Sequence, residues 1–107
     1  MSELIITKEN FEQEVINSKV PVMLDFWAEW CGPCRMLSPI VSQIADDFKD
    51  TAKVGKVNVD NEQELAAAFR IASIPTIAVI KNGKVVGSSV GYRPKEELSD
   101  LLKKAID

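Results

Sequence analysis

Two cysteines, Cys31 and Cys34, are the residues whose type and spacing most directly predict chemistry. They stand in the run Trp30-Cys31-Gly32-Pro33-Cys34, and the 107-residue sequence holds no other cysteine and no histidine. A tetrahedral zinc site normally takes four Cys or His ligands, so these two sulfurs alone do not complete one. The pair therefore predicts thiol–disulfide redox chemistry and no metal site.

Cys31 is expected where a buried strand ends and a long helix begins. The partial positive charge of a helix N-terminus favours the thiolate, so the pKa of the Cys31 thiol should fall toward neutral pH. Cys34, one turn further along, should be less exposed and gain less from the helix. This asymmetry predicts that Cys31 attacks a substrate disulfide and that Cys34 resolves the mixed disulfide. Gly32 permits close backbone approach, and Pro33 fits the first helical turn.

The alternative for the two cysteines is a passive bridge or a pair of inert buried thiols. Residues 1–8 show neither the basic region nor the apolar run of a secretory signal, so we expect a cytoplasmic protein. In a reducing compartment a Cys-x-x-Cys pair is more often catalytic than structural. A bridge that closes so short a loop would also remove little entropy from the unfolded chain.

Asp25 is the one charged residue in the apolar run 20–28. Burial of a carboxylate is costly, so its pKa should rise above the ordinary value. A buried aspartate can serve catalysis, or it can be a structural group satisfied by local hydrogen bonds. On the residues alone both interpretations stay open.

Length and composition favour one domain that spans residues 1–107. Hydrophobic residues make up 46% of the chain and charged residues 27%, as in an ordinary globular protein. The net charge of -3 argues against a nucleic-acid or anionic-membrane surface. No apolar run approaches the roughly 18 residues that a spanning helix needs. Proteins or small molecules are therefore the expected partners.

The first half of the chain predicts strands that alternate with helices. A short strand at 4–6 precedes a helix at 7–17 for which Thr7 is the expected N-cap. The nearly continuous apolar run 20–28 predicts a central strand covered on both faces. Helical spacing of apolar residues then predicts a helix from the cysteines to about residue 49, kinked at Pro39.

The second half continues the pattern and ends in a hairpin. A strand at 52–59 is expected before a short helix at 62–69 capped by Asp60. Two β-prone runs, 76–80 and 84–90, are joined through Asn82-Gly83, a strong hairpin signal, so they should be antiparallel. Pro94 suits the first turn of a last helix with a regular apolar stripe. Together these units predict an α/β fold with a mixed sheet between helices.

The chain resembles the thioredoxin family over essentially its whole length. The resemblance rests on the segment Asp25–Arg35, on Ile74-Pro75-Thr76 and on Asn82-Gly83. It implies the thioredoxin fold: four helices around a five-stranded sheet in the order first, third, second, fourth, fifth, with the last two strands antiparallel. A lowered cysteine pKa in this motif is a known property of that family, and the expected position of Cys31 at a helix N-terminus accounts for it.

The resemblance also implies a function. Members of the family are general protein disulfide reductases that bind no cofactor and carry a redox-active disulfide, here Cys31–Cys34. A separate flavoprotein, thioredoxin reductase, recharges them with electrons from NADPH. The partners implied are this reductase and proteins with exposed disulfides, and the expected state is a monomer.

Several further roles follow from the resemblance alone. Asp25 matches the acid that exchanges a proton with the resolving thiol, and Lys56 on the neighbouring strand matches its lysine partner. Pro75 matches a cis-proline that faces the cysteines. Trp30, Gly32 and Pro33 form the active-site loop, with Trp30 either a half-exposed platform or ordinary core. The positions that match the family's peptide groove are Trp30, Val59, Ser73, Ile74, Pro75, Val90, Gly91 and Tyr92.

Two rival functions remain at this point. The surface around Trp30, Ile74 and Gly91 could clamp a partner protein without redox turnover, a use that would survive loss of both cysteines. A disulfide-forming oxidase would need a strongly stabilised thiolate. The dipeptide Gly32-Pro33 resembles that of the reducing members of the family.

Overall fold

A five-stranded mixed sheet forms the centre of the protein. The computed structural model describes residues 2–106. The strands are β1 (Leu4–Ile5), β2 (Val22–Trp27), β3 (Lys53–Asn58), β4 (Thr76–Lys81) and β5 (Lys84–Val90). They lie in the order β1-β3-β2-β4-β5, with β1, β3 and β2 parallel and with β4 antiparallel to both β2 and β5. The expected fold is therefore confirmed.

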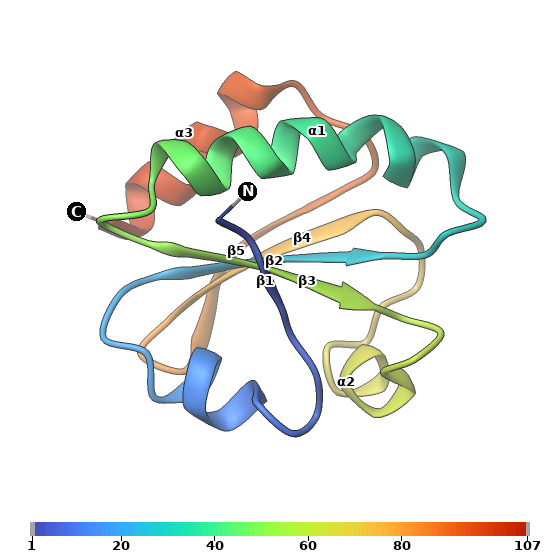
Figure 1. Cartoon of the computed structure of the whole chain (residues 1–107), viewed down its shortest axis with the longest axis horizontal. Helices are drawn as coiled ribbons and strands as arrows, with labels where there is room; N and C mark the ends of the chain where they lie inside the picture. Colours follow the sequence, from blue (N-terminus) through green and yellow to red (C-terminus); the bar gives the residue numbers. More distant parts are fainter. Residues whose placement is uncertain (1, 107) are drawn as a thin grey trace.

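Four helical segments cover the sheet. They are η1 (Glu12–Ile16), α1 (Gly32–Asp47), α2 (Gln63–Ala68) and α3 (Lys95–Ile106). Figure 1 shows α1 and α3 on one face of the sheet and η1 and α2 on the other. Each face has its own apolar core, one built around Met23 and Leu37 and the other around Leu24 and Phe26. Strand β2 is consequently buried on both faces, as its continuous apolar run predicts.

The expected N-cap at Thr7 is wrong. Residues 8–10 form a turn, and η1 begins only at Glu12. The Asn10 side chain organises this turn, because its Oδ1 accepts the Thr7 N–H at 2.8 Å and its Nδ2 donates to the Ile5 carbonyl at 2.9 Å. Asparagine side chains often form hydrogen bonds with nearby backbone N–H and C=O groups in this way. Because the turn takes up residues 8–10, the helix is shorter at its N-terminal end than expected.

The expected cap at Asp60 is also wrong. Helix α2 begins at Gln63 without a side-chain cap. Asn58 Oδ1 instead accepts the N–H groups of Asp60 and Asn61, at 2.9 and 3.3 Å, and shapes the turn that leaves β3. The Asp60 carboxylate is thereby left to bind a residue of the active-site loop.

The other local signals agree with the structure. Asn82 and Gly83 have φ angles of 54° and 77° and join β4 to β5 in a two-residue turn. Pro94 directly precedes α3, and its carbonyl accepts the Leu98 N–H at 3.3 Å. Helix α1 continues through Pro39, and a kink there stays a prediction.

Candidate active site

Cys31 and Cys34 form a disulfide at the start of α1. Cys31 is the extended N-cap residue of the helix, and its Sγ accepts the Cys34 N–H at 3.2 Å. Both residues are buried, Cys31 at 5% and Cys34 at 2% relative exposure. A backbone donor aimed at Cys31 Sγ at a helix N-terminus favours negative charge on that sulfur once the bridge is reduced.

The carbonyl of Ile74 lies beside the bridge. Its oxygen is 3.8 Å from Cys31 Sγ, and the Ile74–Pro75 peptide bond is cis, as the resemblance implies. The Pro75 carbonyl accepts the Gly91 N–H at 2.8 Å. The loop that carries Pro75 and the end of β5 are therefore joined next to the cysteines.

Asp25 is buried on β2, with 1% relative exposure. Neither of its carboxylate oxygens has a hydrogen-bond partner among residues 2–106, so local hydrogen bonds do not satisfy it. Burial raises the pKa of Asp25 from 3.8 to about 6, and the nearby charge of Lys56 opposes this rise. Lys56 Nζ lies 3.8 Å from Asp25 Oδ2.

Lys56 is held by groups other than Asp25. Its Nζ donates to Ser38 Oγ at 2.9 Å and lies 4.7 Å from the centre of the Trp27 ring. Ser38 was not expected as a site residue. It follows Cys34 by four residues and so lies on the same side of α1, a spacing from which it could have been inferred.

Trp30 and Trp27 have different environments. Trp30 is 68% exposed, and its indole N–H donates to Asp60 Oδ2 at 2.9 Å, so this ring is a surface platform rather than core. Trp27 packs against the cluster of Ala28 and the two cysteines. Asp60, expected as a helix cap, is thus a partner of the active-site loop.

A surface groove gathers part of the expected peptide site. It is lined by Trp30, Val59, Ser73 and Ile74 together with Ala66, Ile71 and Ala72, and the last three were not expected. Ile71 and Ala72 precede Ser73 directly, which is the signal that could have found them. We call this hollow the cysteine groove, because Val59 and Ile74 also pack against the disulfide.

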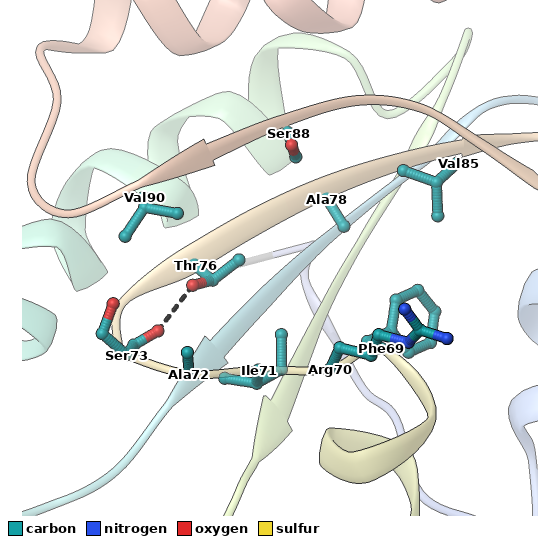
Figure 2. Close-up of a pocket in the computed structure, with 10 residues that line it drawn as sticks. All are labelled: Phe69, Arg70, Ile71, Ala72, Ser73, Thr76, Ala78, Val85, Ser88 and Val90. Carbon is teal, nitrogen blue, oxygen red and sulfur yellow. Dashed lines mark hydrogen bonds between the residues drawn. The ribbon is translucent and has the colours of Figure 1, made fainter.

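The remaining expected groove residues lie elsewhere. Val90 lines a second hollow, shown in Figure 2, which shares Ile71, Ala72 and Ser73 with the cysteine groove. Pro75, Gly91 and Tyr92 are not among the residues that line either hollow. At Gly91 φ is +88°, and a Cβ there would meet no atom within 4 Å, so the space over this backbone is open.

Within residues 2–106, no group of three or more His, Cys, Asp or Glu side chains is placed to hold a metal ion. In the same part of the chain, no helix is both long enough and apolar enough to span a membrane.

Fold and site together define a thiol–disulfide oxidoreductase, and comparisons with known proteins agree. The thioredoxin family model matches residues 2–104. Thioredoxin from Haemophilus influenzae is 45% identical over 107 residues, covering 99% of this chain and 100% of that protein. Thioredoxin from Pyropia yezoensis is 46% identical over 106 residues, 99% of each chain. Thioredoxin 1 from Nostoc sp. is 48% identical over 99 residues, 92% of each chain. The chain therefore belongs to the thioredoxin family.

Proposed function

We propose that this protein is a general protein disulfide reductase. The observation that carries the proposal is the asymmetry of the cysteine pair. Cys31 caps α1 and its sulfur accepts the Cys34 N–H, whereas Cys34 lies inside the first turn. Cys31 is the nucleophile, because the helix N-terminus and this donor stabilise its thiolate.

The reaction consists of two exchanges. In the reduced protein, the Cys31 thiolate attacks a substrate disulfide, forms a bond to one substrate sulfur and releases the other as a thiolate. The deprotonated Cys34 then attacks Cys31 Sγ, which re-forms the Cys31–Cys34 bridge and releases the second substrate thiolate. Two electrons pass from the protein dithiol to the substrate, whose two thiolates take up protons.

Asp25 exchanges a proton with the Cys34 thiol in the second step, and Lys56 tunes that acid. A pKa of about 6 keeps Asp25 able both to take and to give a proton near neutral pH. The Lys56 ammonium at 3.8 Å holds the pKa below the value that burial alone would set. The support for this role is the burial of Asp25 without hydrogen bonds, which leaves its charge responsive to its surroundings.

The substrate lies across the active-site loop of Trp30, Gly32 and Pro33. Trp30 supplies an exposed aromatic surface, and the open space above Gly91 admits a peptide backbone. The residues proposed to contact the substrate are Trp30, Val59, Ser73, Ile74, Pro75, Val90, Gly91 and Tyr92, together with Ala66, Ile71 and Ala72 of the cysteine groove.

A separate thioredoxin reductase, a flavoprotein supplied by NADPH, returns electrons to the bridge, and the chain itself binds no cofactor. The protein acts as a monomeric single domain in the cytoplasm. It acts on proteins with exposed disulfides, not on nucleic acids or membranes.

Serine substitutions of the two cysteines test the mechanism. Cys34→Ser should leave Cys31 able to attack but unable to be released, so it should trap substrates as covalent mixed disulfides. Cys31→Ser should abolish reduction of insulin disulfides with dithiothreitol as the electron source. If the Cys31→Ser protein still reduced insulin, the assignment of Cys31 as the nucleophile would be wrong.

The second candidate function is a binding module. It is favoured by the exposed apolar side chains of Trp30, which precedes Cys31, and of Val90 and Tyr92, which flank Gly91 where it bonds to the Pro75 carbonyl. A Cys31→Ser, Cys34→Ser double variant that still captured a partner in a pull-down would support this function. Loss of capture in the double variant would support the reductase.

A further inference from the structure

A second apolar hollow lies on the sheet between β5 and the loop that precedes β4. Figure 2 shows its floor on β4, at Thr76 and Ala78, with Val85, Ser88 and Val90 of β5 along one side. Cross-strand pairing explains why these side chains meet, because Thr76 pairs with Val90 and Ala78 with Ser88. Val85 and Val90 are 54% and 52% exposed. We call this hollow the β5 groove.

The β5 groove continues the cysteine groove. The two share Ile71, Ala72 and Ser73 as lining residues. In Figure 2, Ser73 and Val90 lie at one end of the β5 groove, and Arg70 and Val85 lie at the other. A peptide that leaves the disulfide along the loop can therefore remain on apolar surface until it reaches Arg70.

Arg70 ends the groove with a positive charge that has no partner among the described residues. The other two arginines are engaged, since Arg35 donates to the Glu29 carbonyl at 2.7 Å and Arg93 lies 3.6 Å from Glu97. Among residues 2–106, no ion pair or hydrogen bond holds the Arg70 guanidinium, and no residue that lines the β5 groove is acidic. Arg70 also has a φ of 55°, which is uncommon for any residue other than glycine.

We propose that the β5 groove binds the substrate segment that flanks the attacked disulfide, and that Arg70 selects segments with a carboxylate. This inference rests on the proposed reductase function and names a substrate class for it. Ile74, whose carbonyl oxygen lies 3.8 Å from Cys31 Sγ, follows Arg70 by four residues, so at about 3.3 Å per extended residue we place the carboxylate about five residues from the attacked cysteine. The spacer between them is apolar or small, because it crosses Val90, Thr76 and Ala78.

Peptides that differ at one position test this selection. Each peptide carries a single cysteine in a mixed disulfide with glutathione. An extension of about five small or apolar residues that ends in Glu, Gln or Lys is attached to this cysteine. The extension is placed on the N-terminal side in one set of peptides and on the C-terminal side in the other. The measured quantity is the second-order rate constant for reduction by the pre-reduced protein, expressed as a ratio of the Glu peptide to the Lys peptide. For one orientation of the extension we expect a ratio of about five at low salt. The ratio should approach one near 1 M salt, where screening is strong.

Variants at position 70 assign this preference. Arg70→Gly removes the charge and suits the left-handed backbone, so this variant should fold. Its ratio of the Glu-peptide rate constant to the Lys-peptide rate constant should fall to about one. Arg70→Lys keeps the charge and should keep the preference. Lys103→Gln removes the same charge from the last turn of α3, on the other face of the sheet, and should leave the ratio unchanged.

The outcomes separate the two proposals. Equal rates for the Glu and Lys peptides in both orientations, or a preference that Arg70→Gly retains, would overturn the role of the β5 groove while the reductase function stood. A dimer that Arg70→Gly dissociates would also overturn it, because a second copy would then occupy the groove. Failure to reduce insulin disulfides would overturn the reductase function, and the inference with it.

Discussion

Lys56 Nζ lies 3.8 Å from Asp25 Oδ2, yet its side-chain hydrogen bond goes to Ser38 Oγ at 2.9 Å. Asp25 therefore has a nearby positive charge but no hydrogen-bond partner among residues 2–106. Charge proximity lowers the pKa of a carboxyl, and burial without hydrogen bonds raises it. Burial dominates here, and the pKa of Asp25 is raised to about 6.

The first prediction concerns stability against pH. Because the pKa of Asp25 rises from 3.8 to about 6 on folding, the folded protein holds this proton more tightly than the unfolded chain. The contribution to stability is complete below pH 3.8 and is lost as the pH rises through about 6. Asp25→Asn removes the buried charge, so above pH 6 its free energy of unfolding should exceed that of the unsubstituted protein by up to about 3 kcal/mol.

Urea unfolding of the oxidised proteins between pH 4 and about pH 8 measures this difference. The advantage of Asp25→Asn should shrink toward pH 4. Asp50→Asn is the matched control, because Asp50 is exposed and its substitution should shift stability little at any pH. An advantage that grew toward low pH would contradict the raised pKa.

The second prediction separates charge from position at Lys56. Lys56→Met keeps an apolar stem but removes the ammonium that opposes the burial of Asp25, so the pKa of Asp25 should rise further. Ser38→Ala leaves the charge and removes only the hydrogen bond that positions it, so it should change the pKa of Asp25 by less than Lys56→Met does. Carboxyl ¹³C NMR titration reads both effects. An unchanged Asp25 titration in Lys56→Met would remove Lys56 from the role proposed for it.

The third prediction concerns the anchoring of Trp30. The indole N–H donates to Asp60 Oδ2 at 2.9 Å, which orients a ring that is otherwise exposed. Asp60→Ala frees the Trp30 ring, so the substrate must order the ring when it binds. We expect this to cost about 1 kcal/mol of binding free energy, which lowers kcat/KM for insulin reduction roughly fivefold. Asp60→Asn keeps an acceptor oxygen and should lose less. Equal kcat/KM in Asp60→Ala and the unsubstituted protein would show that the bond does not orient Trp30 for substrate.

The fourth prediction concerns Gly55, the glycine of the sheet at which an added Cβ would have the least space. Gly55 of β3 lies under Ile6 and Leu24, and a Cβ there would collide with the Ile6 side chain and lie 3.2 Å from Leu24 Cδ2. Gly55→Ala should therefore destabilise the protein by about 1–3 kcal/mol through overpacking. Urea unfolding at neutral pH measures this loss.

An Ile6→Ala, Gly55→Ala double variant checks that overpacking is the cause. Ile6→Ala makes room for the new methyl, so the double variant should be less destabilised than the sum of the two single losses. Additive losses would mean that Gly55→Ala acts through something other than contact with Ile6.

Most of the elements could be predicted because their signals are local. The apolar run 20–28 contains β2, and the turn Asn82-Gly83 has positive φ at both residues, as the dipeptide predicts. The two errors were also local, since Thr7 and Asp60 lost their expected capping roles to Asn10 and Asn58. Short polar side chains compete closely for the same backbone groups, and sequence pattern does not decide which one forms the bond.

The sequence by itself determined the chemistry of the pair at 31 and 34, because three-residue spacing at a strand-to-helix junction depends only on neighbouring residues. Tertiary structure decided the partners that surround the pair. Ser38 holds Lys56 from 18 positions away, and Asp60 holds Trp30 from 30 positions away. Arg70 and Val85 line one groove because strand order and register bring the loop before β4 alongside β5. Such contacts depend on long-range packing, which local sterics and hydrogen-bonding preferences do not encode.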